Sequence, residues 1–206
     1  MQILIYIAIV LLVIFGWWYN SPQRKGKRGE KKVSALLEKL SNDYHILNDV
    51  IFQTDKGTTT QIDHIVVSKY GVFAIETKNY RGEIYGDDTR EEWTQIIVTE
   101  VRYRRKWWKT YTYVTKNQFY NPVRQSLGHT YRIRSILKDY KYLPIVSIVV
   151  FVGDAELKNV QTRHHVIYAE QLLSVINQYQ NTCLSDKDLQ RVLRLLNDNS
   201  CSAYMT

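Results

Sequence analysis

Residues 61–78 read QIDHIVVSKYGVFAIETK, two apolar, β-branched runs on either side of a short Lys-Tyr-Gly turn. Runs of this kind, joined by a turn that contains glycine, predict a β-hairpin. If residues 69–70 form a two-residue loop, Asp63 lies directly opposite Glu76. Lys78 then projects from the same side of its strand as Glu76, because strand side chains alternate between faces. The hairpin therefore predicts three charged side chains on one face.

Two carboxylates placed opposite each other repel and weaken a hairpin, and a divalent cation between them would remove this repulsion. Asp63 and Glu76 offer oxygen ligands suited to Mg²⁺ (or Mn²⁺), and the backbone carbonyl of Thr77 is a further predicted ligand. Such a metal can orient a scissile phosphate and lower the pKa of the attacking water. Lys78 can hold that water or offset the charge of a pentavalent phosphate. These parts predict a metal-dependent phosphodiester hydrolase.

A helix precedes the hairpin, because Val33, Leu36, Leu37 and Leu40 follow the i, i+3, i+4, i+7 rule. Glu30 falls on the same apolar stripe, where a carboxylate is unusual. It is either a first-turn acid that meets the helix dipole or a residue that reaches the site to complete the metal shell or position the water.

Residues 3–19 contain no charged side chain and end in Trp-Trp-Tyr, a typical interfacial aromatic belt. As a helix this segment would be roughly 25 Å long, enough to cross a bilayer. A cleaved signal peptide would need a positive residue before the apolar run, and Met-Gln supplies none. The cations follow the run instead, in a basic linker over 20–27 and the residues after it. The positive-inside rule then predicts a single-pass membrane anchor with the C-terminal domain in the cytoplasm.

The chain has 206 residues and a formal net charge of +8, which suggests an anionic partner, either nucleic acid or an acidic membrane surface. Its two cysteines, Cys183 and Cys201, have no paired spacing, so neither a disulfide framework nor a zinc site is expected. No Gly-rich phosphate loop of the NTPase type is present in the sequence.

Further elements follow from apolar patterning and turn signals. We expect strands over 45–52, 93–101, 111–115, 145–152 and 165–168, and helices over 122–140, 169–179 and 185–197. The run 145–152 is continuously apolar, as in a strand buried on both faces.

The segment 102–109, RYRRKWWK, packs five cations among three aromatic residues. Cations neutralise phosphates and tryptophan can stack on an unpaired base, so we predict that this segment binds nucleic acid. Contact with anionic lipid and a purely structural hairpin tip are the alternatives. The predicted contact residues are Arg102, Arg104, Arg105, Lys106, Trp107, Trp108 and Lys109.

Gln125, His129 and Arg132 form a polar stripe at i, i+4, i+7 of the helix that follows Asn-Pro. The stripe is either a solvated face or a set of contacts to the site or to phosphate. His64 lies on the strand face opposite Asp63, so we expect it to pack in the core rather than bind a ligand.

Together, several motifs resemble the nuclease-related domain family, a branch of the restriction-endonuclease-like PD-(D/E)xK superfamily. They are Gly29-Glu30, Gln61-Ile-Asp-His-Ile, the run from Gly71 to Tyr80 (GVFAIETKNY), Trp93, and Asn121-Pro-x-x-Gln125. One departure is that Ile62 replaces the proline that precedes the aspartate in the superfamily signature.

The resemblance implies an α/β fold with a central mixed β-sheet flanked by helices, over a core of 28–152 with a helical C-terminal part at 153–206. It implies a Mg²⁺-dependent nuclease site at Glu30, Asp63, Glu76 and Lys78, with Gln125 as a further site residue. The expected function is hydrolysis of phosphodiester bonds in DNA, or RNA, at the membrane. The alternative is an inactive nuclease fold that binds nucleic acid or a protein partner there.

Overall fold

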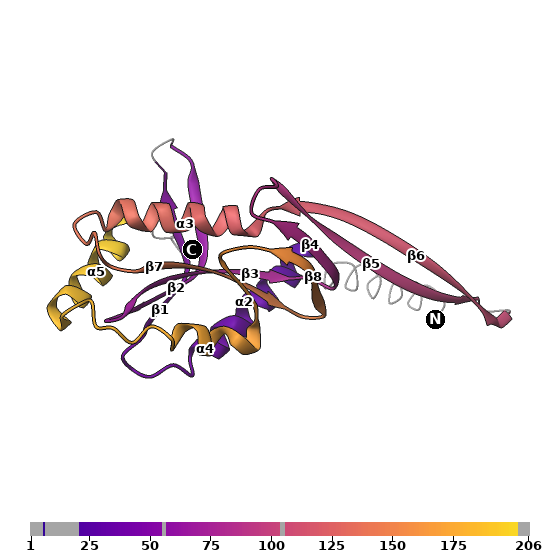
Figure 1. The fold of residues 1–206 in the computed structure, drawn as a ribbon, viewed down its shortest axis with the longest axis horizontal. Coiled ribbons are helices and arrows are strands. Elements are labelled where there is room, and N and C mark those ends of the chain that lie inside the picture. The colour runs from indigo at the N-terminus through magenta and orange to yellow at the C-terminus, as the bar shows by residue number, and fades with distance from the viewer. Residues whose placement is uncertain (1–5, 7–20, 55–56, 104–105, 202–206) are drawn as a thin grey trace.

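The computed structural model describes Tyr6 and residues 21–54, 57–103 and 106–201, with the side chains of 102–109 left out. Within these ranges the chain forms two mixed sheets flanked by helices (Figure 1). The first sheet has the order β1-β2-β3-β7-β9, and the second has the order β6-β5-β4-β8. The predicted α/β class with mixed sheets and flanking helices is confirmed, although the strands are divided between two sheets rather than one.

The first sheet is built from strands that the apolar runs predict. They are β1 (His45–Gln53), β2 (Thr59–Ser68), β3 (Gly71–Asn79), β7 (Ile145–Val152) and β9 (His165–Tyr168). β7 pairs in parallel with β3 on one side and with β9 on the other, and its last six residues are buried. A strand enclosed between two neighbours and two helical layers has no solvated face, which explains its continuous apolar sequence.

The predicted register of the β2–β3 hairpin is confirmed. Ser68 pairs with Gly71, and the ladder runs to the pair His64 and Ile75, directly before Asp63 and Glu76. On its other side β3 pairs with β7 from Val72 to Asn79, so Glu76 and Lys78 keep this neighbour after the ladder with β2 has ended. The ladder between β2 and β3 therefore ends at the predicted acidic pair, where β3 continues beside β7 alone.

Two helical layers enclose the first sheet. On one face, α3 (Pro122–Ile136) and α5 (Asp186–Asn199) pack on side chains that include Ile65, Val67 and Ala74. On the other face, α2 (Pro22–Leu37) and α4 (Leu172–Ile176) pack on Phe73 and Ile75. Because side chains alternate, Asp63, Glu76 and Lys78 belong to the face covered by α3.

The helix α2 begins at Pro22, so most of the predicted linker over 20–27 is helical. Proline suits the first helical position, and the Gln, Arg and Lys residues that follow are good helix formers. Farther along the helix, a Cβ on Gly29 would lie 2.8 Å from Cβ of Asn79 and 3.0 Å from Val152. Glycine therefore allows α2 to approach the ends of β3 and β7 closely.

The second sheet contains two strands that we did not expect, β4 (Gly82–Asp87) and β8 (Ala155–Gln161). Both are short and mostly polar, and they pair in parallel. The C-terminal part after 152 is therefore not purely helical. The predicted helix over 169–179 is shorter, with a 3-10 turn, η1 (Ala169–Gln171), before α4.

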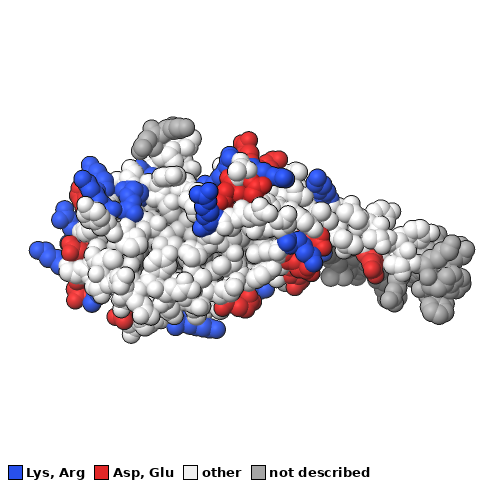
Figure 2. Space-filling model, in the orientation of Figure 1, with Lys and Arg blue, Asp and Glu red and all other residues white. Residues whose placement is uncertain are grey.

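β5 (Glu92–Tyr103) and β6 (Lys106–Tyr120) are longer than predicted and form a hairpin that projects from the body (Figure 1). At its root, Trp93 is fully buried and stacks on Phe151 with a 4° angle between the rings. On the face drawn in Figure 2, charged side chains gather on the body, and few appear on the part of the hairpin that is not drawn in grey.

The predicted membrane anchor over 3–19 lies outside the described residues, apart from Tyr6. None of the helices in the described ranges is both long enough and apolar enough to span a bilayer. The anchor stays a prediction from the sequence.

Candidate functional site

Glu76 and Lys78 form the centre of the candidate site. The Glu76 carboxylate is buried, and its Oε1 accepts a hydrogen bond from Lys78 Nζ at 2.7 Å. Lys78 Nζ also donates to Gln125 Oε1 at 3.0 Å. The ammonium group is thus fixed between a strand carboxylate and a helix amide, beside the end of β3.

The second oxygen of Glu76 is held by His129. His129 is buried, and its Nε2 donates to Glu76 Oε2 at 3.1 Å, while its Nδ1 lies 3.1 Å from Thr60 Oγ1. A solvated-face explanation for this histidine is therefore wrong, and contact with the site is confirmed. Although burial alone would raise the Glu76 pKa, the bonds from His129 and Lys78 outweigh it and lower the pKa.

Asp63 lies beside this cluster in a different electrostatic state. Its Oδ2 accepts a hydrogen bond from the Thr77 backbone N–H at 2.8 Å. Burial, followed by the negative charge of Glu76, raises the pKa of Asp63 from 3.8 to about 7. Glu76 is therefore ionised at neutral pH, whereas Asp63 is near the midpoint of its titration. Such a difference in pKa between two neighbouring carboxyl groups is typical of functional pairs.

The start of α3 places Gln125 and His129 over the sheet. The Oδ1 of Asn121 accepts from Val123 N, which caps the helix. Its Nδ2 donates to the carbonyl oxygens of Asp87 and Arg90, at 3.0 and 2.7 Å. The Asn-Pro motif therefore starts the helix and also binds the N-terminal end of the helix to the turn that precedes β5.

Glu30 approaches from the opposite side of the sheet, because it lies on α2. Its negative charge interacts with those of Asp63 and Glu76. Partial burial raises the pKa of Glu30, with smaller contributions from Asp49 and Glu76. Its predicted part in the metal shell stays a prediction.

His64 is buried on the α2 face, as expected for a core residue, with Nδ1 2.7 Å from Asn48 Oδ1. Burial lowers its pKa to about 4, so the ring is neutral at physiological pH. Arg132 is half-buried farther along α3. The predicted nucleic-acid contacts over 102–109 involve side chains outside the described set.

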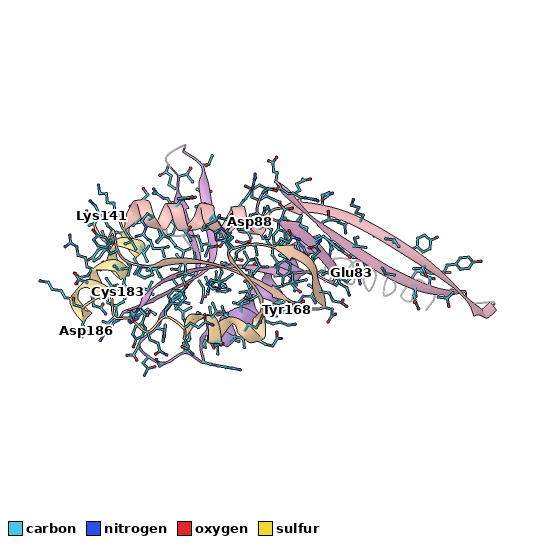
Figure 3. The ribbon with its side chains drawn as sticks, viewed as in Figure 1. Glu83, Asp88, Lys141, Tyr168, Cys183 and Asp186 are labelled. Carbon is cyan, nitrogen blue, oxygen red and sulfur yellow. The ribbon has the colours of Figure 1, made fainter. Side chains whose placement is uncertain are left out.

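Residues labelled in Figure 3 mark the two ends of β3. Cys183 and Asp186, at one end in Figure 3, mark the β2–β3 turn, where Lys69 pairs with Asp186 at 2.7 Å. Glu83, on the strand that follows β3, lies toward the other end, near the projecting hairpin (Figure 3). β3 runs between these markers, so Glu76 and Lys78 fall at its end nearer the hairpin.

The donor set fits Mg²⁺. Asp63 Oδ1 makes no hydrogen bond to a described residue, and each Glu76 oxygen keeps a lone pair besides the one that accepts its present bond. Mg²⁺ typically takes one or two carboxylates and keeps several waters. Across the described ranges, no three His, Cys, Asp or Glu side chains converge closely enough to hold a metal by themselves. Two carboxylates with waters, and the predicted Thr77 carbonyl, are therefore the fitting set.

Comparison with known proteins agrees with these motifs. The sequence profile of the nuclease-related domain matches residues 25–152. An uncharacterized protein of Bacillus anthracis is 35% identical over 202 residues, which cover 93% of this chain and 86% of that protein. No solved structure matches the chain. The profile spans more than half of the chain, including Glu30, Asp63, Glu76, Lys78 and Gln125, so the chain belongs to the nuclease-related domain family.

Proposed function

We propose that the chain is a membrane-anchored, Mg²⁺-dependent nuclease that hydrolyses phosphodiester bonds, with DNA as its substrate. The observation that carries the proposal is the group formed by Asp63, Glu76 and Lys78 on one face of the β2–β3 hairpin. Membership of the nuclease-related domain family supports it. The anchor is the apolar segment 3–19.

Each residue has a distinct task in this proposal. The Lys78 ammonium group is held in place by hydrogen bonds to Glu76 and Gln125. From this position it would offset the negative charge of a phosphoryl transition state. Gln125 accepts from Lys78 through its oxygen, which leaves its NH₂ group to donate to a phosphate oxygen. When bound, Mg²⁺ would orient the phosphate and acidify the attacking water.

Asp63 and Glu76 would hold the cation, and their different pKa shifts suit this task. Glu76 stays ionised, whereas Asp63 exchanges its proton near neutral pH. A cation between them would favour the ionised form of Asp63, because it offsets the repulsion from Glu76 that adds to the effect of burial on the Asp63 pKa. Metal binding should therefore release a proton from Asp63 near pH 7.

The test is cleavage of a panel of labelled single-stranded, double-stranded and branched DNA and of RNA by the full chain in detergent. Cleavage that requires Mg²⁺ or Mn²⁺ and is abolished by Asp63→Ala together with Lys78→Ala supports the proposal. Substrate binding should survive in this double variant. A chain that neither cleaves any substrate nor binds metal in calorimetry would refute it.

The second candidate is a non-catalytic module that binds nucleic acid or a protein partner at the membrane. One observation favours it: Lys78 and His129 already occupy both oxygens of Glu76, so the carboxylate is stabilised without a metal. Calorimetry separates the two functions. The non-catalytic module would bind nucleic acid with the same affinity whether or not Mg²⁺ is present, and would take up no metal.

A further inference from the structure

The outer part of the β5–β6 hairpin lies beyond the pairing of β5 with β4. β4 pairs with β5 only as far as the pair Glu83 and Ile96, and beyond it β6 is the only described strand that pairs with β5. The two strands have 12 and 15 residues, whereas strands of about 5–6 residues are usual. A two-stranded ribbon is only marginally stable in water, so this hairpin is expected to lie against a partner.

The two faces of this ribbon differ in charge. We define the stem as residues 97–101 and 110–115. One face carries the pairs Thr99–Tyr113 and Val101–Tyr111 and has no charged residue. Val101 and Tyr113 on this uncharged face are 47% and 67% exposed. The opposite face carries Val98 with Val114, and Glu100 with Thr112.

The composition of the stem does not suit nucleic acid. Binding along a phosphate backbone requires cations, and the only charged residue in the sequence of the stem is Glu100. Tyrosine, threonine and valine are instead suited to the boundary between lipid headgroups and acyl chains, where an aromatic ring buries its body and exposes its polar tip. Figure 2 shows few charged side chains on the part of the projecting hairpin that is not drawn in grey.

The root of the hairpin lies beside the start of α2. Asn79, at the end of β3, donates from Nδ2 to the carbonyl oxygen of Lys25 at 2.6 Å, and β4 begins three residues after Asn79. The apolar segment 3–19 ends three residues before Pro22, where α2 starts. A bilayer crossed by that segment would therefore meet the domain at the end from which the hairpin projects.

Two further properties decide how the hairpin meets the bilayer. On the side of β5 that faces away from β6, no described strand pairs with residues 97–101, so the stem keeps an open edge and cannot enter the hydrocarbon core. The segment 102–109, which includes the ends of both strands, carries five cations in sequence, and each cation adds to the attraction toward an anionic surface. The headgroup layer of an anionic bilayer suits both properties, because it offers hydrogen-bonding partners to the open strand edge and negative charge to the cations.

We propose that the uncharged face of the stem is a second membrane contact, lying in the headgroup layer of an anionic bilayer beside the anchor. This inference rests on the membrane anchoring in the proposed function, but not on nuclease activity. The contact would hold the body of the domain in a fixed orientation to the membrane.

The test places a fluorescent label on either face of the stem in the full chain. With Cys183 and Cys201 replaced by Ser, single cysteines at Thr99 or Val98 carry an environment-sensitive NBD group. The chain is reconstituted in vesicles of phosphatidylcholine with or without phosphatidylserine, and the label is challenged with lipids that bear a quencher near the headgroup. Thr99 and Val98 are neighbours on opposite faces, so each serves as the control for the other.

The proposal expects the Thr99 label to shift its emission to the blue and to be quenched several-fold more strongly than the Val98 label, with phosphatidylserine enhancing both effects. Equal responses at the two positions would overturn it. A Thr99 label that responds to DNA rather than lipid would overturn it too and assign the face to nucleic acid. A response in detergent that grows with protein concentration would instead assign the face to a second copy of the chain.

A paired substitution checks the same face without a label. Thr99→Glu with Tyr113→Glu is expected to loosen the hairpin from vesicles, and Val98→Glu with Val114→Glu is the matched control. Each variant places two glutamates directly opposite each other, so the repulsion within the hairpin is similar in both. The loosening is measured as faster proteolysis of the β5–β6 segment in the vesicle-bound chain. Equal proteolysis in the two variants would contradict the proposal. A chain that does not float with vesicles at all would contradict both the anchor and the stem contact. Cleavage of short soluble DNA is measured separately, because nuclease activity does not depend on the stem contact.

Discussion

Replacing Asp63 by Asn should stabilise the folded protein at alkaline pH, because it removes a buried charge held against Glu76. The substitution keeps the side-chain oxygen that accepts the 2.8 Å hydrogen bond from Thr77 N–H. It also keeps the size of the side chain, so packing on the sheet should change little. The difference in the free energy of unfolding between wild type and Asp63→Asn should therefore reflect the charge of residue 63.

The magnitude follows from the shift of the Asp63 pKa from 3.8 to about 7. Because the folded state binds this proton more tightly than the unfolded chain, wild-type stability falls as pH rises between these values. Each pH unit is worth about 1.4 kcal/mol, so an interval of roughly 3 units gives at most about 4 kcal/mol. The amide of the Asp63→Asn variant has no proton to lose, and this variant should gain up to that amount at pH 8.

The assay is urea unfolding of both full chains in detergent without metal, from pH 4 to pH 8. The free energies of unfolding should nearly coincide at pH 4, where Asp63 is protonated, and diverge steadily toward pH 8. Asp63→Ala is the control for the hydrogen bond, because it removes the charge but leaves Thr77 N–H without its acceptor. An Asp63→Asn variant that is no more stable than wild type at pH 8 would refute the electrostatic account of the site.

Three more perturbations test the neighbouring contacts. Mg²⁺ at about 100 times its dissociation constant should stabilise wild type by about 2.7 kcal/mol at pH 8 in thermal unfolding, and an equal gain in Asp63→Asn would place the metal elsewhere. His129→Ala leaves Glu76 Oε2 without its donor and should lower the free energy of unfolding by about 1–3 kcal/mol, measured in urea; an unchanged value would mean that the contact adds nothing. Gly29→Ala brings a Cβ to 2.8 Å from Asn79 and should cost about 1–3 kcal/mol by the same method, whereas Gly26→Ala, with 3.7 Å to its nearest neighbour, should cost nothing.

The sequence predicts the β2–β3 hairpin because alternation and a two-residue turn leave one register that buries the apolar side chains. The same register brings Asp63 beside Glu76 and places Lys78 on the same face. The position of Gln125 could also be anticipated, because Asn121-Pro122 marks a helix start and motif resemblance singled out this residue.

Other features depend on contacts that no local pattern reveals. β4 and β8 are short and mostly polar, and they form by pairing with neighbours that are distant in the sequence: β8 with β4, and β4 with both β8 and β5. The burial of His129 depends on how α3 crosses the sheet. The helical stripe alone does not show whether its side chains face solvent or the site. Glu30 could be recognised as unusual, but its place on the face opposite Glu76 follows only from the packing of α2.

The most direct test of the central claim is metal-dependent cleavage by the full chain, with wild type compared with Glu76→Gln and Lys78→Ala. Removing the carboxylate charge or the ammonium group should lower the Mg²⁺-dependent cleavage rate by about 100-fold or more, since each contributes to transition-state charge stabilisation. DNA binding, measured by fluorescence anisotropy, should stay unchanged. Wild-type protein that binds DNA but cleaves none with Mg²⁺ or Mn²⁺, or variants that cleave as fast as wild type, would contradict a nuclease site at Asp63, Glu76 and Lys78.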